Sequence, residues 1–115
     1  MREPTFEQAG IDSQSFVVAG LMATCPFDGS DVTYLVEIEC RALRRCLRIE
    51  YVRDTVDALV REPITAEALA SAIADRLTQA FDGYGHAEVA VHHDAVNGVM
   101  LTARTFSMMR KALMP

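Results

Sequence analysis

The stretch that decides the fold is Val32-Thr33-Tyr34-Leu35-Val36-Glu37-Ile38-Glu39-Cys40, in which apolar and polar residues alternate. Successive side chains of a β-strand point to opposite faces, so this pattern predicts a strand with one buried face. The apolar face carries Val32, Tyr34, Val36, Ile38 and Cys40, and the polar face carries Thr33, Glu37 and Glu39. Leu35 interrupts the polar face, which indicates that this second face is partly covered.

The residues before this strand predict an earlier strand and a loop. Residues 15–24 read Ser-Phe-Val-Val-Ala-Gly-Leu-Met-Ala-Thr and predict a first strand that ends next to Cys25. Residues 26–31 contain Pro, Gly and Asp, which favour a loop. Residues 1–14 are polar and contain Pro4 and Gly10, so we expect an irregular segment there.

The residues after it predict two helices. Residues 41–48 are rich in arginine and either continue the strand with a bulge or form a connection. The repeat of Val52, Val56 and Val60 at every fourth position then predicts a short helix, which Pro63 closes. Thr65 is a plausible N-cap for a second helix. An unbroken apolar stripe marks this second helix, formed by Leu69, Ile73, Leu77 and Phe81.

The last part of the chain predicts a β-hairpin. Residues 87–91 alternate between apolar and polar, Asn97-Gly98 is a strong hairpin signal, and residues 99–103 resume the alternation. The order strand, strand, helix, helix, strand, strand predicts an α+β domain over residues 15–107, with a four-stranded antiparallel sheet and two helices on one face. Residues 108–115 form a tail. The free edges of such a sheet favour association into a homo-oligomer.

Composition excludes several classes of protein. With 115 residues the chain forms one domain, and its net charge of −5 argues against binding of nucleic acid through a basic surface. No apolar run reaches the roughly 20 residues that span a bilayer. The charged N-terminus has no apolar signal region, so we expect a cytoplasmic protein. The three cysteines have no CxxC spacing, which excludes a four-cysteine zinc site within one chain.

Cys25 is the candidate nucleophile, because Pro26 and a Gly/Asp turn follow it and favour a presented thiol. Asp31 lies six residues later as the candidate general acid or base, and Asp28 is its rival. The structural alternatives are a small apolar cysteine at a strand end and ordinary turn chemistry for the aspartates. For Cys40 and Cys46 we favour a purely structural role.

With these elements in place, the chain resembles the tunnelling (T-fold) superfamily, which includes GTP cyclohydrolases, pterin enzymes and the QueF nitrile reductases. Over residues 16–107 it is most similar to QueF and to the short QueF-like amidinotransferases. Their nucleophile segment corresponds to Cys25-Pro26-Phe27-Asp28-Gly29-Ser30-Asp31-Val32, which is one residue shorter. Glu50 opens the first helix and Glu67 the second, at the places of two family glutamates. Asn97-Gly98-Val99 resembles the last hairpin of the family.

The resemblance implies a substrate and a mechanism. The substrate would be a purine or 7-deazapurine such as 7-cyano-7-deazaguanine, bound between subunits of a homo-oligomer. Cys25 would attack the nitrile carbon to give a covalent thioimide, and Asp31 would donate a proton to the nitrile nitrogen. Glu67 would anchor the base edge, where the alternative is a simple interaction with the helix dipole, and Glu50 would also face the substrate. Reduction with NADPH, or amidine formation, would complete the reaction.

Two departures from the family keep other functions open. Ala66 stands where QueF has a histidine, and Glu50-Tyr51-Val52-Arg53-Asp54 retains only the glutamate of the stretch linked to NADPH. One alternative is a zinc-assisted enzyme similar to GTP cyclohydrolase, and another is an oligomeric ligand-binding protein without catalysis. We expect no metal site, because neighbouring His92 and His93 point to opposite faces of a strand and His86 completes no histidine motif.

Overall fold

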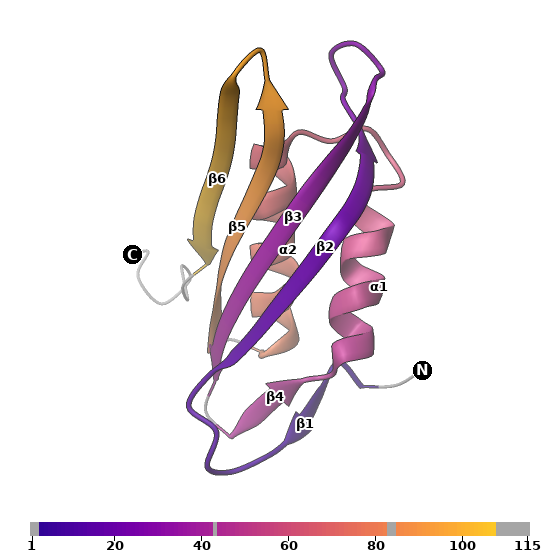
Figure 1. Cartoon of the computed structure of the whole chain (residues 1–115). Coiled ribbons are helices and arrows are strands. Elements are labelled where there is room, and N and C mark those ends of the chain that lie inside the picture. Colours follow the sequence, from indigo (N-terminus) through magenta and orange to yellow (C-terminus); the bar gives the residue numbers. More distant parts are fainter. Residues whose placement is uncertain (1–2, 43, 83–84, 108–115) are drawn as a thin grey trace, which may run out of the picture.

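The computed structural model describes residues 3–42, 44–82 and 85–107, and it consists of one sheet layer and one helix layer (Figure 1). The elements are β1 (Thr5–Glu7), β2 (Gln14–Thr24), β3 (Asp31–Ala42), β4 (Arg45–Leu47), α1 (Ile49–Leu59), α2 (Ala66–Ala80), β5 (Gly85–Val96) and β6 (Val99–Ser107). The main sheet has the order β2-β3-β5-β6 with antiparallel neighbours, and both helices cover one of its faces. The predicted α+β architecture is confirmed.

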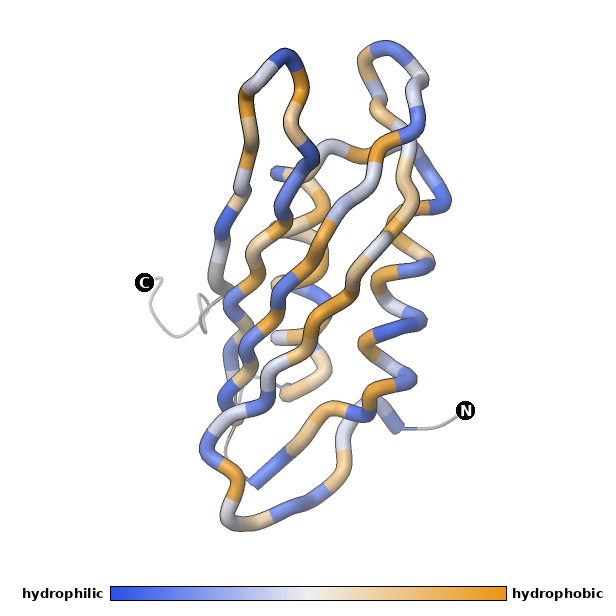
Figure 2. Tube along the Cα trace, in the orientation of Figure 1, coloured by the Kyte–Doolittle hydropathy of each residue, from blue (hydrophilic) through white to orange (hydrophobic). Residues whose placement is uncertain are grey.

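Strand β3 lies at the centre of the core, and its apolar face is the predicted one. Tyr34, Val36, Ile38 and Cys40 are at most 2% exposed, whereas Leu35 and Glu37 between them are exposed. The alternation of apolar and polar residues along the sheet strands can be followed in Figure 2. Because the register pairs Val36 with Val18 on one side and Val91 on the other, apolar side chains from three strands meet under the helices.

The helices follow the predicted stripes. Leu69, Ile73 and Leu77 of α2 are fully buried against the sheet, and the Thr65 hydroxyl caps this helix by accepting a hydrogen bond from the Ala68 N–H at 3.1 Å. Helix α1 ends at Leu59, before Pro63, and Val60 forms its C-cap. In the described part of the chain, no helix is long and apolar enough to cross a membrane.

The segment expected to be irregular contains a short strand. Residues 5–7 form β1 and pair with β4, which lies in the arginine-rich stretch. Arg45 donates two hydrogen bonds to the Thr5 hydroxyl, at 3.1 and 2.7 Å, and the Arg48 guanidinium lies 5.5 Å from the centre of the Phe6 ring. These arginines therefore hold the N-terminal segment in place. Three residues are too few to show an alternating pattern, so the sequence did not reveal this strand.

The turns position the strand ends. Asn97 and Gly98 both have positive φ, at 52° and 79°, as a two-residue type I′ hairpin requires, so the predicted hairpin is confirmed. The β5–β6 hairpin and the β2–β3 loop lie at the same end of the sheet, close to the connection between the helices (Figure 1). Residues 108–115, the predicted tail, lie outside the described residues.

Candidate functional site

The β2–β3 loop closes tightly around Cys25. The Cys25 N–H donates to the carbonyl oxygen of Ser30 at 2.8 Å, and the Gly29 N–H donates to the Cys25 carbonyl at 2.9 Å. Gly29 has φ of +73°, a conformation that costs glycine little and lets the chain reverse here. Cys25 is half-buried, in contrast to the buried Cys40 and Cys46. The loop therefore presents one accessible thiol at the end of β2.

Asp28 is held within this loop by Ser30. Its Oδ1 accepts hydrogen bonds from the Ser30 hydroxyl at 2.7 Å and from the Ser30 N–H at 2.9 Å. These bonds, with the Ser30 hydroxyl first, hold the pKa of Asp28 below its usual value. The loop thus keeps an ionised carboxylate in the same turn as the thiol.

Tyr34 fastens the helix connection to this end of the sheet. Its hydroxyl donates to the carbonyl oxygen of Ile64 at 2.9 Å, and the Ile64 N–H donates to the carbonyl of Thr24 at 3.1 Å. Thr24 directly precedes Cys25, and Thr65, which follows Ile64, is the N-cap of α2. The start of α2, with Glu67 in its first turn, is consequently tied to the strand end that carries Cys25.

Cys25 and Glu67 both act on the pKa of the Tyr34 hydroxyl. The pKa of Tyr34 is raised by burial and, in smaller measure, by the negative charges of Cys25 and Glu67. The hydrogen bonds from Tyr34 to Ile64 and from Ile64 to Thr24 supply the geometric link, because Thr24 precedes Cys25 and Glu67 lies in the first turn of α2. Glu67 itself is solvent-exposed, and its carboxylate is accessible to a ligand. Two residues predicted from distant parts of the sequence are therefore brought to one place.

His93 also belongs to this cluster. Its ring meets the Tyr34 ring edge-on, with centres 5.4 Å apart, and its Nδ1–H donates to the Asp94 carbonyl oxygen at 2.7 Å. This bond leaves Nε2 of the neutral ring as an acceptor. The sequence pattern indicated only a core position for Tyr34 and gave His93 no role beyond that of a possible metal ligand. Alternation placed Tyr34 on the buried face of its strand. Alignment of this strand with β5 would also have placed His93 beside Tyr34.

Asp31 and Glu50 lie outside this cluster in a single chain. Asp31 begins β3 and pairs with Thr24, and strand alternation places it on the sheet face opposite to Tyr34. Glu50 lies in the first turn of α1, which starts beside β1 and β4 at the other end of the sheet (Figure 1). An 11-residue helix is about 16 Å long, so α1 separates Glu50 from the loop around Cys25.

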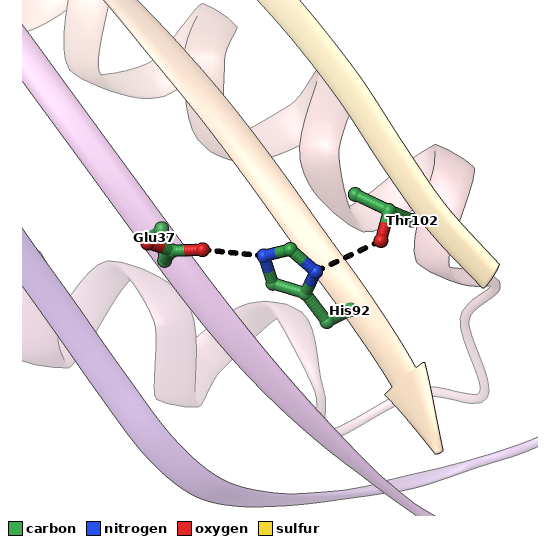
Figure 3. A network of polar contacts seen from close by, with 3 residues as sticks. All are labelled: Glu37, His92 and Thr102. Atoms are coloured by element: carbon green, nitrogen blue, oxygen red, sulfur yellow. Dashed lines mark hydrogen bonds and ion pairs between the residues drawn. The ribbon is translucent and has the colours of Figure 1, made fainter. Parts of the chain in front are cut away.

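The outer face of the sheet carries a separate polar network (Figure 3). His92 contacts the Thr102 hydroxyl through Nδ1 at 2.8 Å and Glu37 through Nε2 at 2.5 Å. An ionised carboxylate only accepts hydrogen bonds, so Nε2 carries the proton and Nδ1 of a neutral ring accepts from Thr102. His92 and His93 therefore point to opposite faces, as predicted. Among the described residues, no group of three or more His, Cys, Asp or Glu side chains is placed to hold a metal ion.

A groove of about 610 Å³ lies between the free edge of β2 and helix α1. Its walls are mainly apolar and include Phe16, Val18 and Met22 of β2, Ile49 and Val52 of α1, and Val60, the C-cap of α1. Neither Cys25 nor Glu67 lines it. This groove is therefore distinct from the cluster around Tyr34. It lies where α1 leaves part of β2 uncovered.

Comparison with known proteins finds likenesses among solved structures only. No family model matches the sequence, and no curated protein matches it. Among solved structures, the crystal structure of the archaeosine synthase QueF-Like in the apo form is similar, with a TM-score of 0.75. The two share 20% sequence identity, and the alignment covers 85% of this chain and 95% of that chain. The order of strands and helices and this likeness together show that the chain has the QueF-like tunnelling fold.

Proposed function

We propose that this protein is an enzyme that binds a purine or 7-deazapurine, such as 7-cyano-7-deazaguanine, and attacks its nitrile through Cys25. One observation carries the proposal: hydrogen bonds from the Tyr34 hydroxyl to Ile64 and from the Ile64 N–H to Thr24 tie the strand end that carries Cys25 to the start of α2, which carries Glu67. One group is a nucleophile and the other matches the hydrogen-bond donors of a guanine-like edge. The likeness in fold to an archaeosine synthase supports the same class of substrate.

Each group has a definite task in this reaction. The exposed Glu67 carboxylate accepts hydrogen bonds from the ring N–H and the exocyclic amine of the base, a bidentate pairing that also orients the ring. The Cys25 sulfur then adds to the nitrile carbon, and the nitrile nitrogen takes a proton. The product is a covalent thioimide, which splits a difficult step into two easier ones.

The proposed roles of Asp31 and Glu50 require a second copy of the chain. Both residues lie away from Tyr34 within one chain. In a site that lies between two subunits, the second copy can supply them. Strands β2 and β6 are free edges, and β6 exposes Val99, Met100 and Leu101. We propose that β6 of one copy pairs with β2 of the next, next to the groove along α1, so that repeated head-to-tail contacts close a ring. A monomeric mass in light scattering would contradict this assembly.

The residues present do not fit the nicotinamide cofactor of the reductases. The stretch that corresponds to their cofactor-linked segment has no lysine, Val52 in it is buried, and Arg53 is paired with Asp57 at 3.2 Å. Ala66, at the place of the reductase histidine, is only 2% exposed and offers no proton. We therefore propose no hydride step and favour amidine formation over reduction as the fate of the thioimide.

Intact-protein mass spectrometry after incubation with 7-cyano-7-deazaguanine tests this proposal. The parent protein and a Cys46→Ala control should gain the mass of one ligand, and Cys25→Ala should gain none. An adduct that persists in Cys25→Ala would assign the attack to another group. If the parent forms no adduct, nitrile chemistry is wrong for this protein. Metal analysis would then test the zinc-assisted alternative, and unchanged ligand affinity in Cys25→Ala would favour a binding protein.

A further inference from the structure

We propose that Glu37, His92 and Thr102 form a second reactive site, in which the Thr102 hydroxyl is a nucleophile for activated esters. The three side chains lie on the sheet face that the helices leave open (Figure 3). Hydrogen bonds join them in the order carboxylate, imidazole, hydroxyl, which is the order of groups that activates a hydroxyl in nucleophilic catalysis. This site is separate from Cys25 and does not depend on its chemistry.

The register of the sheet brings these three residues together. Thr102 lies directly opposite His92 in the β5–β6 pair, and Glu37 lies opposite Ala90, two residues before His92, in the β3–β5 pair. Directly opposed side chains are about 5 Å apart and diagonal ones about 7–8 Å, so the imidazole of the middle strand reaches both neighbours. Its Nδ1 lies 2.8 Å from the Thr102 hydroxyl oxygen, and its Nε2 lies 2.5 Å from the Glu37 carboxylate.

These hydrogen bonds put a base next to the hydroxyl. An ionised carboxylate only accepts hydrogen bonds, so the Nε2–H of His92 donates to Glu37, and the unprotonated Nδ1 accepts from Thr102. The 2.8 Å between Nδ1 and the hydroxyl oxygen lies within the range over which a general base takes a proton. Glu37 orients the ring and stabilises the positive charge that the imidazole gains with this proton. Glu37 is thus a positioning residue, and His92 is the base.

An ester can reach this hydroxyl. Thr102 and Glu37 are exposed, and the His92 side chain is 26% exposed. The proposed pairing of β6 with β2 of a second copy uses backbone groups at the strand edge, so it does not need the sheet face. Arg104, two residues after Thr102, belongs to the same face, is exposed and has no hydrogen bond or ion pair to another described residue. Its guanidinium is therefore available to stabilise a developing oxyanion.

The acyl transfer needs only the ester and then water. The Thr102 O–H bond breaks, its proton moves to Nδ1 of His92, and the oxygen bonds to the acyl carbon while the C=O π pair moves to the carbonyl oxygen. That pair returns as the bond to the leaving group breaks, and the leaving oxygen keeps the bonding electrons and takes the proton from His92. The products are a Thr102 ester and an alcohol or phenol. Water repeats these steps on the Thr102 ester and releases the acid.

The test measures acetylation by 4-nitrophenyl acetate in the full chain, after the accessible Cys25 thiol has been alkylated with iodoacetamide. Mass spectrometry of peptides gives the rate at each hydroxyl. Thr33 is the matched control within the same molecule, because it lies on the same sheet face but its hydroxyl contacts the Met22 sulfur, at 3.5 Å, rather than an imidazole. We expect Thr102 to acetylate about 10²- to 10⁴-fold faster than Thr33, the usual contribution of general acid–base catalysis. In urea the two rates should be equal.

Substitutions assign the roles of the other two residues. His92→Gln removes the base and should lower the Thr102 rate to that of Thr33. Glu37→Gln should lower it about ten- to a hundredfold, as for the loss of a hydrogen bond to a charged group. His86→Gln is the matched control, because His86 is on the same face of β5 but away from Thr102, and it should leave the Thr102 rate within about twofold of the parent.

Two results would overturn the proposal. Comparable rates at Thr102 and Thr33 in the folded parent would show that the network only holds β3, β5 and β6 together. An unchanged Thr102 rate in His92→Gln would show that the imidazole is not the base. Circular dichroism checks the fold of each variant. The comparison of Thr102 with Thr33 needs no substitution, so it decides the proposal even if a variant fails to fold.

Discussion

The Tyr34 hydroxyl donates a hydrogen bond to the carbonyl oxygen of Ile64 at 2.9 Å. Ile64 in turn donates its N–H to the carbonyl of Thr24, so a strand of the core, the connection between the helices and the end of β2 are joined in sequence. Glu67 lies one turn after this connection and Cys25 directly after Thr24. The strand end that carries Cys25 and the helix start that carries Glu67 are therefore held together through a buried tyrosine.

Removal of this hydroxyl should loosen the site. In Tyr34→Phe the Ile64 carbonyl loses its donor, so we expect a loss of about 0.5–1.5 kcal/mol in the free energy of unfolding. Urea denaturation measures this. Tyr51→Phe is the matched control, because Tyr51 is only partly buried in α1 and its hydroxyl makes no such bond in the described structure. An equal loss in both variants would show that the bond to Ile64 contributes nothing specific.

Tyr34 should also make the protein sensitive to alkaline pH. Its pKa is raised above the ordinary value of 10.0, chiefly by burial, so the folded state binds this proton more tightly than the unfolded chain. The stabilisation is fully present below the unfolded pKa and is lost as the pH rises through the folded one. We expect the denaturation midpoint to fall more steeply with pH above about 10 in Tyr51→Phe than in Tyr34→Phe. Parallel profiles for the two variants would contradict this assignment.

Substitutions of Glu67 and Glu50 should distinguish a site within one chain from a site between two chains. Glu67→Gln removes one charged acceptor for the base edge, and we expect about a ten- to hundredfold weaker affinity for guanine-like ligands, as for the loss of a hydrogen bond to a charged group. Calorimetry with 7-deazaguanine, which lacks the nitrile, measures binding alone. Glu62→Gln, at an exposed position before α2, is the control.

Glu50→Gln then reports on assembly. Glu50 lies at the far end of α1, so a site within one chain should not respond to it. A loss of affinity in Glu50→Gln, seen only at protein concentrations where the oligomer forms, is expected if the subunits complete one another's sites. Affinity that is unchanged at all concentrations would remove Glu50 from the site.

The sequence predicted those elements in which the periodic pattern is long. Alternation over residues 32–40 located β3 and its buried face, and the stripe from Leu69 to Phe81 located α2, because each pattern repeats often enough to exceed chance. Asn97-Gly98 predicted its hairpin for a different reason, since both residues tolerate the positive φ that the turn requires.

The site was less predictable, because tertiary contacts rather than local patterns create it. Nothing local links Tyr34 to Ile64, and the bond between them forms only when α1 and α2 have packed on the sheet. Likewise, the spacing of Asp28 and Asp31 from Cys25 did not reveal the hydrogen bonds that Ser30 makes to Asp28. These bonds depend on the turn at Gly29, and a single glycine is compatible with many turns.

Thiol labelling should distinguish Cys25 from the other two cysteines. Burial, with a smaller contribution from the charge of Glu39, raises the pKa of Cys40 to about 12, and Cys46 is also buried. Only a thiolate reacts with iodoacetamide, so at mildly alkaline pH the folded protein should take up one label, on Cys25. Peptide mapping locates it, and the same reaction in urea should label all three cysteines. Labelling of Cys40 in the folded protein would show that β3 opens readily.

The β5–β6 turn should tolerate glycine but not a branched side chain. Gly98 has φ of +79°, so Gly98→Val forces a β-branched residue into the left-handed region, at a cost of about 1–3 kcal/mol in the free energy of unfolding. Asn97→Gly is the matched control at the neighbouring position, where φ is 52°, and it should change stability little because glycine adopts this conformation freely. Thermal denaturation compares the two. If Gly98→Val were as stable as Asn97→Gly, the hairpin would have to close through another turn, with a shifted register between β5 and β6.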